Sequence, residues 1–94
     1  MAGYLIFEIE ITDQAAYDHY LAVAGPVLAA GGGTVVLSSA RIEPLEGDWK
    51  PPSISVVSFP SAEDARRFYR SEAYQKVVGL RQVASRARGI LVDA

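Results

Sequence analysis

The sequence predicts a small α+β domain in which an antiparallel sheet is covered by helices on one face. Segments with strand and helix patterns follow in the order strand, helix, strand, strand, helix in two pieces, strand. The two middle strands are joined by a loop, so they form a hairpin between two βαβ halves, which is the ferredoxin-like plan. With 94 residues the chain has the size of one domain, placed over residues 1–94.

The first strand is expected over residues 4–11, where side chains alternate in character. One face is wholly apolar and carries Leu5, Phe7, Ile9 and Ile11. The other face mixes apolar side chains with carboxylates and carries Tyr4, Ile6, Glu8 and Glu10. The apolar face is therefore predicted to pack against helices, and the mixed face to meet a partner or a cavity.

A helix follows, with Asp13 as its N-cap. Its apolar stripe recurs at helical spacing and consists of Tyr17, Tyr20, Leu21, Ala24 and Leu28. Pro26, preceded by Gly25, predicts a kink or break near residue 25, because proline lacks an N–H and clashes with the preceding turn. The glycines at 31–33 end the helix.

The middle of the chain predicts the hairpin. Residues 34–45 have the pattern of a second strand, rich in β-branched side chains at its start, and residues 54–59 that of a third. Between them, residues 46–52 have the composition of a turn.

The last part of the chain predicts a helix in two pieces and a final strand. Ser61 and Asp64 have capping-box spacing, and Ser71 can cap a second helical piece. The inward side chains of the two pieces are expected to be Ala65, Phe68, Tyr69, Tyr74, Val77, Val78 and Leu80. Residues 86–92 form the fourth strand.

Composition argues against several classes of function. The chain has no cysteine, a formal net charge of −2 and no long basic run, so disulfides, thiolate chemistry and nucleic-acid binding are not expected. It has no apolar run of membrane-spanning length and no basic start typical of a signal peptide, which favours a cytoplasmic protein. With a single histidine, no metal site and no cofactor are expected.

Half of the residues are hydrophobic, which is a large share for so short a chain. The sheet face that carries Tyr4 and Ile6 is too apolar to be left in water. Two such faces packed together would bury it, so a homodimer with twofold symmetry is predicted.

Several motifs resemble those of one family. They are Thr12-Asp13 with Tyr17 and Tyr20, Gly32-Gly33, Glu46-Gly47-Asp48-Trp49, Phe59-Pro60-Ser61, Ala65, Phe68-Tyr69, Ser71 to Tyr74, and Leu80-Arg81. In this order, over nearly the whole chain, they resemble the domain-of-unknown-function family 1330, a group of short bacterial proteins in the dimeric α/β-barrel superfamily.

The resemblance implies a dimer whose two sheets form a barrel-like core. It assigns no reaction, because the family has none and the superfamily holds cofactor-independent oxygenases, lactone isomerases, haem proteins and members without known chemistry. Family members often carry a glutamate just before Phe59, where this chain has Ser58. A mechanism through that carboxylate is therefore not expected here.

Candidate site residues on the first helix are Tyr17, His19 and Tyr20. His19 could shuttle protons, since imidazole titrates near neutrality, or simply face solvent, which we favour. The two tyrosines could hold a ligand through their hydroxyls, but on an apolar stripe packing is the more common role.

The other candidates are Trp49, Ser58 and Arg81. Trp49 could cover a pocket or pack against the partner subunit. Arg81 could bind a substrate carboxylate or serve structural carboxylates and helix-end carbonyls, two readings that the sequence leaves open. Glu8 and Glu10 could do acid–base work in an enclosed site, pair with Arg86 or Arg88, or simply face water, and pairing is favoured.

Two functions remain open. One is a small-molecule site between sheet and helices, for a small apolar or carboxylate-bearing molecule, with or without cofactor-free catalysis. The other is a non-catalytic dimeric module for assembly or regulation. We favour the first; whether the protein is an enzyme stays open.

Overall fold

The computed structural model of the protein describes residues 2–94. Four strands and four helices follow in the order β1 (Gly3–Ile11), α1 (Gln14–Ala30), β2 (Thr34–Ser39), β3 (Ile54–Phe59), α2 (Ala62–Arg70), α3 (Glu72–Gln75), α4 (Val78–Ala84) and β4 (Ser85–Asp93). The predicted order of elements is confirmed. No helix of the described chain is long and apolar enough to cross a membrane.

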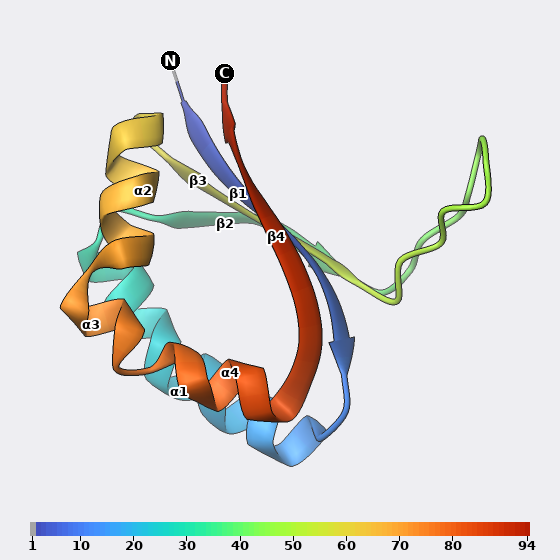
Figure 1. The fold of residues 1–94 in the computed structure, drawn as a ribbon, viewed down its shortest axis with the longest axis horizontal. Coiled ribbons are helices and arrows are strands. Elements are labelled where there is room, and N and C mark those ends of the chain that lie inside the picture. Colours follow the sequence, from blue (N-terminus) through green and yellow to red (C-terminus); the bar gives the residue numbers. More distant parts are fainter. Residues whose placement is uncertain (1) are drawn as a thin grey trace.

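The four strands form one open antiparallel sheet in the order β2-β3-β1-β4. All helices lie on one face of this sheet, and the other face is bare (Figure 1). The two ends of the described chain lie side by side, where Ala2 and Ala94 exchange backbone hydrogen bonds of 2.8 and 2.9 Å. The ferredoxin-like fold is therefore confirmed.

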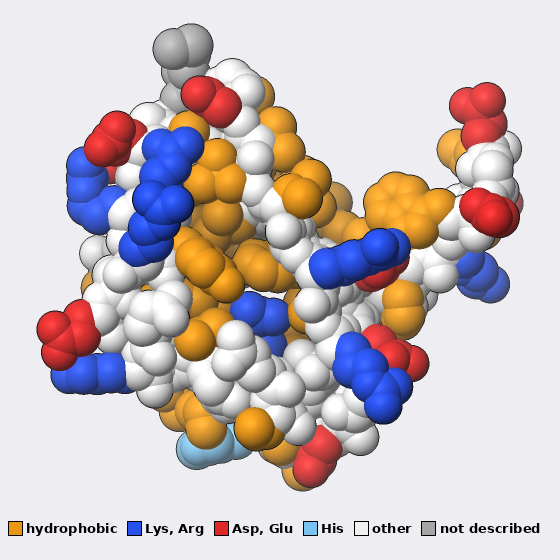
Figure 2. Space-filling model, viewed as in Figure 1, with side chains coloured by type: hydrophobic (Ala, Val, Ile, Leu, Met, Phe, Trp, Pro, Cys, Tyr) orange, Lys and Arg blue, Asp and Glu red, His pale blue; other side chains and the backbone are white. Residues whose placement is uncertain are grey.

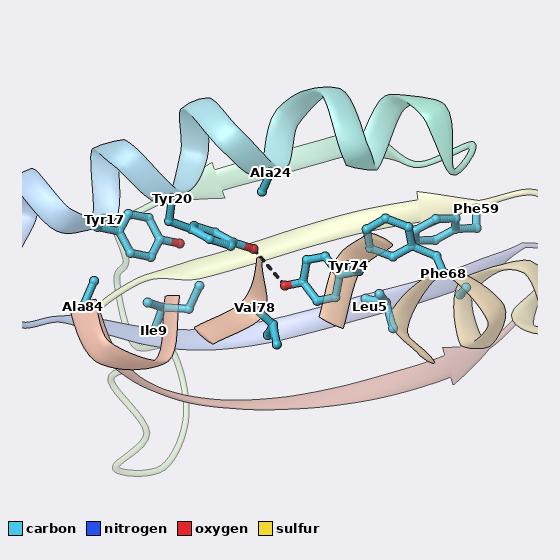
Figure 3. Close-up of a cluster of buried hydrophobic side chains, with 11 residues drawn as sticks. Leu5, Ile9, Tyr17, Tyr20, Ala24, Phe59, Phe68, Tyr74, Val78 and Ala84 are labelled. Carbon is cyan, nitrogen blue, oxygen red and sulfur yellow. Dashed lines mark hydrogen bonds between the residues drawn. The ribbon is translucent and has the colours of Figure 1, made fainter. Parts of the chain in front are cut away.

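The core fills the space between the sheet and the helices. Strands β1 and β3 contribute Leu5, Ile9 and Phe59, and the helices contribute mainly aromatic rings and small side chains (Figure 3). Aromatic rings form a chain of contacts in which Phe68 lies 5.2 Å from Phe59 and 4.8 Å from Tyr74, measured between ring centroids. Small side chains such as Ala65 and Ala84, both fully buried, let the helices approach the sheet.

Helix α1 begins as predicted, since the Asp13 carboxylate accepts a hydrogen bond from the Ala16 N–H at 3.0 Å. The prediction of a kink or break near residue 25 is wrong as regards a break, because α1 continues as one helix through Pro26 to Ala30. Pro26 is exposed, so its ring points away from the core while the buried stripe from Tyr17 to Ala24 anchors the helix. Gly32, with φ of 85°, then ends it in the left-handed conformation.

Strand β2 is shorter than the predicted 34–45 and ends at Ser39, which pairs with Ile54 at the start of β3. Beyond that pair, Pro51 and Pro52 on the opposite side lack the N–H groups that a longer ladder needs. Residues 40–53 instead form a long excursion that projects away from the body of the molecule (Figure 1). We refer to residues 40–53 as the arm.

The second helical region is divided after α2, as predicted, and its second piece is divided again into α3 and α4. Ser61 and Ser71 each accept a hydrogen bond, at 3.1 Å, from the N–H three residues ahead, and so cap α2 and α3. The Ser71 hydroxyl also donates to the Phe68 carbonyl at 2.6 Å, which joins the end of α2 to the start of α3. These bonds turn the chain so that α3 and α4 lie across the sheet beside α1 (Figure 1).

The bare face of the sheet carries the side chains that alternate with the core. Tyr4 and Ile6 of β1 lie there beside their neighbours Ser58 and Val56 of β3, and Val92 and Ile90 of β4. Ile90 is 61% exposed. The predicted mixed character of this face is confirmed, and Glu8 and Glu10 pair with Arg88 and Arg86 of β4, as favoured from the sequence.

Candidate functional site

A cavity of about 140 Å³ lies between the sheet and the helix layer. Its walls are largely apolar and include Leu5, Ile9 and Val57 from the sheet and Ala24 and Leu28 from α1. Polar atoms enter it from four aromatic or basic side chains and one serine: Tyr17, Tyr20, Tyr74, Arg81 and Ser55. An apolar hollow with a few convergent polar groups is the usual form of a small-molecule site.

Local structure explains how these side chains meet. Tyr17 and Tyr20 lie one turn apart on the buried stripe of α1, with ring centroids separated by 5.6 Å. Tyr74 is brought opposite them by the short, Ser71-capped α3. Arg81 projects from α4, where the Ser85 hydroxyl donates to the Arg81 carbonyl at 2.7 Å and fastens the end of the helix.

Arg81 is the one buried charged side chain among residues 2–94, with 6% of its surface exposed. Its guanidinium carbon lies 4.8 Å above the centre of the Phe7 ring, a cation–π contact. Its Nε has no hydrogen-bond partner in the described chain, and none of the ion pairs there involves it. A buried cation without a carboxylate is costly, so an acceptor is missing at this point.

The guanidinium keeps its charge. Burial works against the charged form, but the hydroxyl groups of Tyr74, Tyr20 and Tyr69 together outweigh it, so the pKa of Arg81 lies above its ordinary value. Arginine is in any case protonated at every pH of interest. The cavity therefore contains a permanent positive charge.

Two of the tyrosines are hydrogen-bonded to each other. The hydroxyl oxygens of Tyr20 and Tyr74 lie 2.8 Å apart in the interior (Figure 3). Burial, and then the bond to Tyr74, raise the pKa of Tyr20 far above its ordinary value, and burial also raises the pKa of Tyr17. At neutral pH both phenols are uncharged, so they can donate hydrogen bonds to an anion but are poor bases.

A groove of about 400 Å³ lies next to the cavity, between α2 and β4. Leu5 and Phe7 line both spaces, so the cavity and the groove share part of their apolar lining. On the groove side, the Phe7 ring stacks against Tyr69 with centroids 6.4 Å apart. Figure 2 shows the molecule hollowed here, with hydrophobic side chains inside and basic side chains along the edge that α2 forms.

The structure brings together three of the six residues suggested by the sequence: Tyr17, Tyr20 and Arg81 all line the cavity. Sequence reasoning missed two others. The apolar stripe predicts only a packing role for Tyr74, although a hydroxyl group on such a stripe indicates a buried polar contact. Phe7 was predicted to be core, but nothing in the sequence indicated that it would lie under Arg81.

The other three suggested residues lie outside the cavity. His19 is exposed on α1, and Ser58 pairs with Tyr4 and belongs to the bare face of the sheet. Trp49 belongs to the arm and is 60% exposed. Its indole N–H donates to Glu8 Oε1 at 2.8 Å, while Arg88 Nε donates to Glu8 Oε2 at 2.6 Å, so Glu8 ties the arm to the sheet.

No group of three or more His, Asp or Glu side chains within residues 2–94 is placed to hold a metal ion. The cavity lining contains neither a carboxylate nor an imidazole. The arrangement can therefore hold an anion beside apolar surface, because it combines one fixed cation, neutral phenol donors and a small, mostly apolar space.

The model of one protein family, described as "Domain of unknown function (DUF1330)", matches residues 2–94. No curated protein shows significant similarity to the chain. Several solved structures are similar to it in fold. A protein of unknown function from Rhodopseudomonas palustris is 21% identical, with a TM-score of 0.72 over 99% of this chain and 82% of that one.

Two further structures share the fold at lower identity. A dimeric ferredoxin-like protein of unknown function from Jannaschia sp. is 12% identical, with a TM-score of 0.73 over 100% of both chains. SnoaB, a cofactor-independent oxygenase from Streptomyces nogalater, is 13% identical, with a TM-score of 0.71 over 99% of this chain and 92% of its own. At these identities the likeness concerns the fold alone.

Proposed function

This chain belongs to the DUF1330 family of domains of unknown function, and on that premise we propose that it binds a small organic acid in the cavity between sheet and helices. The carboxylate of the ligand accepts hydrogen bonds from Arg81, and its apolar part lies among the aromatic walls. One observation carries the proposal: Arg81 is a buried cation, aimed into a cavity, that lacks a carboxylate partner in the described chain.

The energetic argument is one of charge balance. Arginine presents a planar fork of donors that matches a carboxylate, and such bonds are strongest where water is excluded. Phe7 offsets part of the cost of the buried charge, but its ring cannot accept the hydrogen bonds of the guanidinium. A carboxylate would supply the missing charge and the missing acceptor together.

The size of the cavity limits the part of the ligand that it can hold. A hollow of about 140 Å³ is close to the size of engineered cavities that bind benzene. The group next to Arg81 is therefore a carboxylate on a single ring or on a short aliphatic chain. Binding is the activity that the geometry supports best, because the lining offers hydrogen-bond donors but no side chain that readily takes up a proton.

The proposed assembly is a homodimer. Apolar side chains of the bare face, including Ile6, Val56 and Ile90, favour a second sheet packed against it. The Jannaschia protein with the same fold is described as dimeric. The alternative function, a dimer for assembly or regulation without a ligand, relies on this face and not on the cavity.

Native mass spectrometry of the purified protein, followed by titration with benzoate, tests the proposal. We expect a dimer that carries a small acid or takes up benzoate, and loss of that binding in Arg81→Gln. Arg86→Gln serves as the control, since Arg86 is exposed on β4 and pairs with Glu10. Equal binding by Arg81→Gln and the unaltered protein would exclude the cavity as the site.

A further inference from the structure

The groove beyond Phe7 is about 400 Å³, well above what a single ring needs and within the usual range for a drug-sized ligand. Its floor is apolar and includes Leu5, Phe7 and Leu91. Because Leu5 and Phe7 also line the cavity, a ligand whose carboxylate reached Arg81 would have the groove as the nearest space for the rest of its length.

The groove has a basic edge. Arg66 and Arg70 both line it from α2, one helical turn apart. Like charges at this spacing repel each other along a helix. No carboxylate of residues 2–94 forms an ion pair with either side chain, and none is part of the groove lining.

Arg67, which lies between them in the sequence, differs on both points. It pairs with Glu63 at 3.7 Å and with Asp64 at 2.9 Å, and it does not line the groove. The helix therefore neutralises the arginine that faces away from the groove and leaves the two that face it available to an anion.

From these contacts we infer that the ligand is an elongated apolar molecule with an anionic group at each end, one at Arg81 in the cavity and the other at Arg66 and Arg70 on the edge of the groove. This inference relies on the proposed function, because it extends the same site. Three arginines that lack carboxylate partners in the described chain, arranged around one continuous apolar surface, fit a dianion better than a simple fatty or aromatic acid.

The test compares straight-chain monocarboxylates with the matching α,ω-dicarboxylates, with roughly 6–12 carbon atoms to suit the combined spaces. Affinities are measured by calorimetry for the unaltered protein, the double variant Arg66→Gln/Arg70→Gln, Arg81→Gln and the control Arg67→Gln. We expect the best dicarboxylate to bind about five-fold or more tightly than its monocarboxylate partner. That advantage should vanish in Arg66→Gln/Arg70→Gln and persist in Arg67→Gln.

Salt provides a second readout. Ion pairs at the exposed edge of the groove are screened by salt, whereas a pair with buried Arg81 is screened much less. The advantage of the dicarboxylate should therefore shrink as ionic strength rises, while monocarboxylate affinity changes little.

The outcomes separate the two proposals. Equal affinities for both acids, or an advantage that survives Arg66→Gln/Arg70→Gln, would overturn the inference and leave the proposed function standing, provided that Arg81→Gln weakens both acids. If Arg81→Gln changes neither affinity, the cavity is not the site and both proposals fail. Absence of binding by every acid would overturn both as well.

Discussion

The hydroxyl groups of Tyr20 and Tyr74 share a buried hydrogen bond of 2.8 Å, although the two residues are separated by 54 positions in the chain. The bond joins α1 to α3 across the cavity. Replacing one tyrosine by phenylalanine leaves the other hydroxyl buried without this partner, which costs about 1–3 kcal/mol of unfolding free energy. We expect Tyr20→Phe/Tyr74→Phe to cost less than the two single changes added together, as measured by urea denaturation. Simple additivity would mean that the two hydroxyls are not coupled.

Arg81 is expected to reduce stability in the absence of a ligand. Arg81→Met removes a buried charge and keeps an apolar side chain of similar length, a change that is often neutral or stabilising by about 1–4 kcal/mol. We predict an unchanged or raised melting temperature together with loss of benzoate binding. A fall in unfolding free energy of several kcal/mol would instead assign Arg81 a structural role. Arg81→Lys should retain charge but lose most of the affinity, because lysine lacks the planar fork.

The absence of a side chain at Gly89 leaves room for the Phe7 ring. A Cβ added at Gly89 would collide with the Phe7 ring, so Gly89→Ala forces the ring out of its position beneath Arg81. Overpacking of this kind costs about 1–3 kcal/mol, and acid affinity should fall with it. Gly79→Ala is the matched control, since nothing lies within 4 Å of its added Cβ and alanine favours a helix. Chemical denaturation and benzoate titration of both variants check the prediction; equal behaviour would contradict it.

The bare face is expected to be the dimer interface. Ile90→Glu places a charge on that face and should shift the protein toward monomers, as measured by analytical ultracentrifugation. Val83→Glu is the control, because Val83 is 76% exposed on α4 in the helix layer. Dissociation by Val83→Glu and not by Ile90→Glu would place the interface on the helices.

The contact between the arm and the sheet should depend on pH. The hydrogen bond from Arg88, and then that from Trp49, hold the pKa of Glu8 below its ordinary value of 4.5. Because the folded pKa is lowered, the stabilisation is complete above 4.5 and is lost as the pH falls through the lowered value. The fluorescence of Trp49, the only tryptophan, should change in that acidic range. Glu8→Gln should abolish the transition and Glu10→Gln should retain it; a transition that survives Glu8→Gln would assign it to another group.

The fold could be predicted from the sequence because it depends on local patterns. Alternation along residues 4–11 defined the two faces of the first strand, and Asp13, Ser61 and Ser71 marked the helix starts. The errors arose where tertiary contacts outweigh local preference. Packing of the buried stripe keeps α1 continuous through Pro26. The arm begins where the pairing of β2 with β3 ends.

The candidate site could be predicted only in part. Its chemistry was visible in the residue types, since Tyr17, Tyr20 and Arg81 were all suggested, but so were His19, Trp49 and Ser58, which lie elsewhere. By itself the sequence determined the order of elements, the covered face of the sheet and the helix caps, because each depends on neighbours in the chain. Only the tertiary structure decided that Arg81 lies over Phe7 and faces Tyr74 without a carboxylate partner, because burial and charge balance depend on segments that packing brings together.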